Sequence, residues 1–217
     1  MTEPRPDRYP GYDVLAKRDT VSWNDATRKV IDKRLAVPRD PRFFTREEWL
    51  TLQAVCDRIV PQPADRPAVP LAAYVDQKMF EQKHDGYRHA EMPEQGEAWR
   101  RGLAGLEEAA QRQHGTGFAA LDAGRQDDML RQTERGELRA DTLQGMPPQS
   151  FFKHRVIHDI TSAYYAHPTS WSEIGFGGPA SPRGYVRLAL DRRDPWEASE
   201  AHPGREGQAL RENKRVG

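Results

Sequence analysis

The stretch FTREEWLTLQAVCDRIVP, residues 44–61, indicates the fold class of this protein. Thr45 and Glu48 match a capping box, in which the threonine hydroxyl accepts the amide three residues on and the carboxylate reaches back. Apolar side chains then recur three or four residues apart, which is the spacing of one helix face, and Pro61 ends the pattern. We therefore predict a helix over residues 46–60 that packs into a core. Its apolar face consists of Trp49, Leu52, Cys56 and Ile59.

Several other segments show the same helical spacing of apolar residues, and none alternates with the two-residue period of a strand over a useful length. The expected helices cover 23–35, 71–84, 94–114 and 151–166, with one or two shorter pieces between 118 and 130. We therefore predict a mainly α fold, a compact bundle of about five to seven helices.

Proline, glycine and charged residues gather toward the two ends of the chain, which has 217 residues, 17 of them proline and 17 glycine. Such segments pack poorly into regular elements and often order only on a partner. We expect an N-terminal arm with one short helix over 1–42, a helical domain over 43–190, and a charged tail over 191–217 that is disordered or bound to a partner. A long Gly/Pro-rich loop without regular structure is expected near 167–188.

Charge and cysteine content exclude several classes of function. Lys plus Arg equals Asp plus Glu at 33 each, so no net field attracts nucleic acid or an anionic membrane. The single cysteine, Cys56, rules out an internal disulfide and a multi-cysteine metal centre. We find no apolar run near the ~20 residues of a membrane span, no secretory signal and no twin-arginine motif near the start. The expected location is cytoplasmic, or periplasmic if a partner carries the chain.

Two histidines could bear chemistry. His154 and His158 lie four residues apart and so share one helix face, and Asp159 or His167 could supply a third ligand to a metal. Arg155 stands where the zinc-protease motif has its glutamate, and histidines bonded to backbone are commoner than ligands. A stand-alone metal-dependent enzyme is therefore kept as an alternative. We assign no catalytic, cofactor-binding or metal-binding residue to the chain.

The segment HPTSWSEIGFGGPASPRGYVRL, residues 167–188, combines glycines, prolines and large aromatic side chains. Glycine permits close approach of another surface, and tryptophan, phenylalanine and tyrosine often anchor interfaces. The same features suit a loop that covers the protein's own core, and the sequence leaves both interpretations open. The candidate partner-interface residues are Trp171, Gly175, Phe176, Gly177, Gly178, Pro179, Gly184 and Tyr185.

These features resemble the gluconate 2-dehydrogenase subunit 3 family over about Phe44 to Leu188. The most specific part is Trp171 followed by Ile174-Gly175-Phe176-Gly177-Gly178-Pro179 and by Gly184-Tyr185. The resemblance implies a non-catalytic small subunit without a cofactor of its own. It would stabilise, or assist maturation of, a large FAD-dependent glucose–methanol–choline-type dehydrogenase that oxidises a sugar or polyol. It is also compatible with a third, electron-accepting subunit in the complex.

Overall fold

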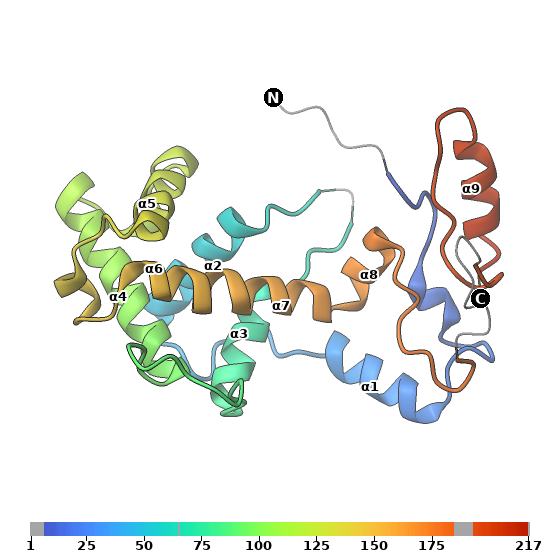
Figure 1. Cartoon of the computed structure of the whole chain (residues 1–217), viewed down its shortest axis with the longest axis horizontal. Helices are drawn as coiled ribbons and strands as arrows, with labels where there is room; N and C mark the ends of the chain where they lie inside the picture. Colours follow the sequence, from blue (N-terminus) through green and yellow to red (C-terminus); the bar gives the residue numbers. More distant parts are fainter. Residues whose placement is uncertain (1–6, 65, 185–192, 217) are drawn as a thin grey trace. The chain divides into compact units, whose positions relative to one another are not determined.

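The computed structural model describes residues 7–64, 66–184 and 193–216. Helices dominate these residues (Figure 1), and we find no strand among them; the only β-type pairing there is one isolated antiparallel bridge between Trp23 and Pro182. The predicted mainly α fold is confirmed. Across the described ranges, no helix is both long enough and apolar enough to cross a membrane.

The helices follow one another in the order α1 (Asp25–Leu35), α2 (Arg46–Ile59), α3 (Leu71–Phe80), α4 (Gln95–His114), α5 (Ala123–Arg135), α6 (Pro148–Phe151), α7 (His158–Ala166), α8 (Pro168–Ile174) and α9 (Glu206–Asn213). A π-helical segment, Phe152–Ile157, joins α6 to α7, so the three form one continuous rod in Figure 1. Short 3₁₀ turns lie at Val14–Lys17, Phe118–Ala120 and Ala140–Leu143.

The chain divides into two compact units. The core unit is Val37–Tyr164, and the terminal unit combines Met1–Ala36 with Tyr165–Gly217. This division differs from the expected arm, domain and tail with boundaries at 42 and 190, because the two ends of the chain pack on each other. Arg8, for example, pairs with Glu200 at 2.7 Å, and the amide of Ala201 donates to the carbonyl of Arg8 at 2.8 Å.

Helix α2 forms as the sequence predicts. The amide of Glu48 donates to the Thr45 hydroxyl at 3.2 Å, and the Glu48 carboxylate accepts from the Thr45 amide at 2.8 Å. Trp49, Leu52 and Cys56 of its apolar face are buried in the core of the core unit, and Ile59 packs against that core. Local capping and helical spacing thus agree with the tertiary packing.

Helices α4 and α6 approach each other closely in the core unit. A Cβ built on Gly102 of α4 would lie only 2.0 Å from the ring of Phe151, so the aromatic ring occupies the space that a side chain would need. Phe151 is fully buried and also contacts Trp99 edge to face, with ring centroids 5.6 Å apart. Burial of such a ring contributes about 2–3 kcal/mol, so this contact is a substantial part of the core.

The terminal unit has a small apolar core of its own, made by residues from both ends of the chain. Its buried members are Tyr12, Val14, Trp23, Ile31, Trp171, Ala198 and Val216. Two of our expectations need correction here, because α8 forms inside the segment expected to be irregular and α9 forms inside the segment expected to be a disordered or partner-bound tail. Helices this short span about two turns, too few for the apolar period to stand out.

Candidate functional sites

Trp171 and Phe176 lie at the centre of the predicted partner-binding segment. Trp171 is only 4% exposed, and its indole nitrogen donates to the carbonyl of Tyr165 at 2.7 Å. Phe176 stacks edge to face on this indole at 5.4 Å between ring centroids, yet it remains 41% exposed. Trp171 therefore anchors the loop inside the terminal unit, whereas Phe176 presents an aromatic surface to the outside.

Two glycines of the segment are required by packing within the terminal unit. Gly175 ends α8 with a φ of 68°, and a Cβ there would lie 2.5 Å from the ring of Tyr9. Gly178 has a φ of 74° and lies against Trp23, Val14 and Trp171. Only glycine adopts this backbone conformation freely, so both positions serve the protein's own fold.

The remaining predicted interface residues divide between a pocket and the undescribed region. Gly177, Gly178, Pro179 and Gly184 line one small pocket of the terminal unit. The space around the Cα of Gly184 is open, because nothing lies within 4 Å of a Cβ built there. Tyr185 lies outside the described residues. Lys17, Trp23 and Arg183 also line this pocket, and no pattern in the sequence identifies them as members of it.

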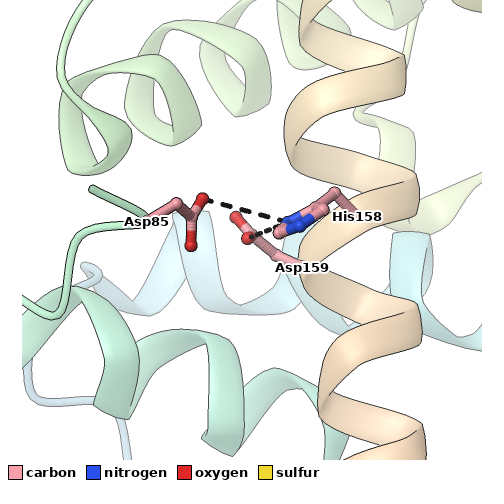
Figure 2. Close-up of side chains that lie close together, drawn as sticks. All are labelled: Asp85, His158 and Asp159. Atoms are coloured by element: carbon pink, nitrogen blue, oxygen red, sulfur yellow. Dashed lines mark hydrogen bonds and ion pairs between the residues drawn. The ribbon is translucent and has the colours of Figure 1, made fainter. Parts of the chain in front are cut away.

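A second candidate site lies in the core unit, where Asp85, His158 and Asp159 bring their side chains together (Figure 2). Asp85 follows α3, and the other two residues begin α7. His158 Nδ1 is 3.3 Å from Asp159 Oδ1 and 3.9 Å from Asp85 Oδ2. Three such groups within reach of one point are what a metal ion would require.

The other proposed metal ligands are not members of this cluster. His154 stacks on His89 instead, with ring centroids 3.7 Å apart, and its pKa is lowered by burial and by the neighbouring positive groups of His89, Lys153 and Arg155. His167 belongs to the terminal unit, where its Nδ1 accepts the amide of Thr169 and caps α8. Within the core unit, His158 therefore lies beside Asp159 and Asp85, and His154 does not belong to this cluster.

Two protein cations already neutralise the two carboxylates. Lys78 Nζ lies 2.6 Å from Asp85 and 2.8 Å from Asp159, while the Arg155 guanidinium lies 2.9 Å from Asp85 and 3.2 Å from Asp159. The indole nitrogen of Trp99 adds a hydrogen bond of 2.8 Å to Asp159. A divalent cation added here would meet two resident positive charges, so the cluster suits a structural ion network better than a metal centre.

The positive neighbours of Asp85 change the pKa of its carboxyl. Burial raises the pKa of this carboxyl, but the hydrogen bonds and positive charges of Lys78 and Arg155 outweigh it and lower the pKa below its ordinary value. The carboxylate is therefore held in its charged form. Such a group stabilises the folded state rather than acting as a proton donor near neutral pH.

Comparison with known proteins assigns the chain to a family. The family model for gluconate 2-dehydrogenase subunit 3 matches residues 46–178, from the first residue of α2 to Gly178. No curated protein and no solved structure matches the chain significantly. The match covers more than half of the 217 residues and includes Trp171, Gly175, Phe176 and Gly177 of the predicted interface. This chain therefore belongs to the gluconate 2-dehydrogenase subunit 3 family.

Proposed function

We propose that this chain is a non-catalytic small subunit that stabilises, or assists maturation of, a large FAD-dependent dehydrogenase of the glucose–methanol–choline type acting on a sugar or polyol. The observation that carries the proposal is the family match, because the family is one of dehydrogenase subunits. In this proposal FAD belongs to the partner, and a third subunit could accept electrons. The chain acts in the cytoplasm unless the partner carries it elsewhere.

The surface of the terminal unit supports a role in binding another protein. Phe176 and Ile174 are large apolar side chains that stay about two-fifths exposed next to the buried Trp171. Because Phe176 is held against Trp171, little conformational entropy is lost when a partner covers it. Rigid aromatic side chains of this kind commonly contribute most to binding energy at protein interfaces.

The chemistry of the described side chains supports a non-catalytic role. Cys56 is buried, and burial raises the pKa of its thiol, which keeps it protonated and weakly nucleophilic. The carboxylates of Asp85 and Asp159 are bound by Lys78 and Arg155 and are therefore occupied in ion pairs. Both groups are better explained by the stability of the core unit than by a reaction.

Affinity purification of the tagged chain from its native host, with mass spectrometry and a visible spectrum of the eluate, tests the proposal. We expect a large co-purifying dehydrogenase with a flavin spectrum. Phe176→Ser should reduce the captured amount several-fold, whereas Phe80→Ser, which changes a 50% exposed phenylalanine of the core unit, serves as the matched control. A colourless single chain that folds and remains alone would contradict the proposal.

A further inference from the structure

A small pocket of the terminal unit gathers positive charge and hydrogen-bond donors. It opens where the 3₁₀ turn Val14–Lys17, the residues before α1 and the loop after α8 meet. Its lining includes Lys17, Ser22, Trp23, Gly177, Arg183 and Glu197. Four of them, Lys17, Ser22, Trp23 and Arg183, carry hydrogen-bond donors that contacts within the described part of the fold leave partly unused.

Lys17 is the most unusual of them, because its side chain is charged and yet only 2% exposed. Its ammonium donates to the carbonyl of Gly177 at 3.2 Å and lies 5.8 Å from the centroid of the Tyr12 ring. Burial, followed by the positive charge of Arg183, lowers its pKa to about 8, and Glu197 opposes this effect. An ammonium has three donors, so one carbonyl leaves capacity for a further acceptor.

Two buried polar atoms of the pocket-lining residues have no partner among the residues that the structure describes. These are the indole nitrogen of Trp23, a side chain only 2% exposed, and the hydroxyl of Ser22. A buried N–H without a partner is unfavourable, and such groups in native proteins usually mark an unseen acceptor. The indole nitrogen can only donate, so its partner must be a hydrogen-bond acceptor, such as a carbonyl or carboxylate oxygen.

The net charge of the pocket lining also favours an acceptor that carries negative charge. Arg183 places its guanidinium 4.2 Å from the centroid of the Trp196 ring and makes no ion pair within the described parts of the chain. Glu197 is the acidic residue of the lining, and its carboxylate already accepts the amide of Asp194 at 2.6 Å. Two cations and one anion leave a net positive charge of about one.

We propose that this pocket binds a carboxylate, supplied by an acidic side chain of the partner subunit. Lys17 and Arg183 would balance its charge, and Trp23 and Ser22 would donate hydrogen bonds to its oxygens. Val21 and Phe176, each next in sequence to a lining residue, are exposed apolar groups that suit the apolar neighbours of such a side chain. The assignment to a partner rests on the proposed function, whereas the carboxylate chemistry does not.

The indole N–H signal of Trp23 in the full-length protein tests the carboxylate chemistry without a partner. Trp23→Phe identifies the signal, and sodium acetate is then titrated against sodium chloride at equal ionic strength. We expect a saturable downfield shift with acetate that chloride does not produce and that Arg183→Gln weakens strongly. The absence of any shift, or an equal shift with both salts, would overturn the proposal and leave a buried water as the acceptor.

Capture of the large subunit tests where the carboxylate comes from. Arg183→Gln should weaken capture several-fold, and Lys33→Gln, which removes an exposed charge from α1 of the same unit, should not. Equal capture of both variants and the wild type would overturn the assignment to the partner, even if acetate binds. If the wild type captures no dehydrogenase, the proposed function fails while the acetate titration still decides whether the pocket takes a carboxylate.

Discussion

Trp99 of α4 donates its indole N–H to the Oδ2 of Asp159 at the start of α7, with 2.8 Å between nitrogen and oxygen. Both side chains are buried, so this bond joins two helices inside the core unit. Trp99→Phe keeps most of the ring but leaves a buried carboxylate oxygen with one donor fewer. We expect the free energy of unfolding to fall by about 1–3 kcal/mol in urea titrations. An unchanged midpoint would show that this bond contributes nothing to stability.

The ion network around Asp85 predicts a loss of stability in acid. Because the pKa of Asp85 is lower in the folded protein than its ordinary value of 3.8, its contribution is complete above that value. The contribution disappears as the pH falls through the lower folded value. We expect the melting temperature of Asp85→Asn to be lower than that of the wild type at neutral pH. On acidification, the melting temperature of the variant should fall less than that of the wild type. Parallel wild-type and variant curves would contradict this account.

The same network predicts how the protein treats metal ions. Lys78 and Arg155 already bind both carboxylates, so dialysed protein should hold no stoichiometric zinc or other transition metal in elemental analysis. His158→Ala should not change the metal content. A stoichiometric metal that survives dialysis and disappears in His158→Ala would instead support the alternative of a metal-dependent enzyme.

Close packing of α4 on α6 predicts an unusual cost for a small substitution. Gly102→Ala would place its Cβ about 2 Å from the ring of Phe151. Overpacking of this kind typically costs about 1–3 kcal/mol, even though alanine is the better helix former. Gly124→Ala in α5 is the control, because its nearest contact is a flexible carboxylate at 3.3 Å. Similar stabilities for both variants would mean that the two helices can separate without loss.

Order in the C-terminal segment depends on Asn213. Its side chain donates to the carbonyls of Pro10 and Ser199 at 3.0 and 2.9 Å and accepts the amide of Ser199 at 2.6 Å. Asn213→Ala should destabilise the terminal unit by about 3 kcal/mol and expose its ends to protease. Arg211→Ala, an exposed change in the same helix, should leave the digestion pattern unchanged. Equal digestion of Asn213→Ala and the wild type would contradict this role of Asn213.

Helix α2 was predictable because its signals are local. The capping box of Thr45 and Glu48, the apolar spacing and Pro61 all act within one segment, and the structure keeps each of them. Helices α8 and α9 were missed for the converse reason, since each has about two turns and is held by packing between the two ends of the chain. No pattern in one segment signals contacts between segments so far apart.

The sites show the same limit. Asp159 could be paired with Arg155 from the helical spacing of four, but Asp85 and Lys78 reach it only through the tertiary fold. In the loop, the composition identified an interface-like segment without deciding where its aromatic residues point. Trp171 turns inward and Phe176 outward because α8 ends at Gly175 between them. That distinction requires the cap geometry as well as the residue types.

The most direct test of the central claim is the flavin content of the captured dehydrogenase when it is produced with and without this chain. If the chain is a stabilising subunit, the large protein made alone should be poorly soluble and largely free of flavin, and co-production should restore a soluble complex that contains flavin. Equal yield and equal flavin content with and without the chain would contradict the account.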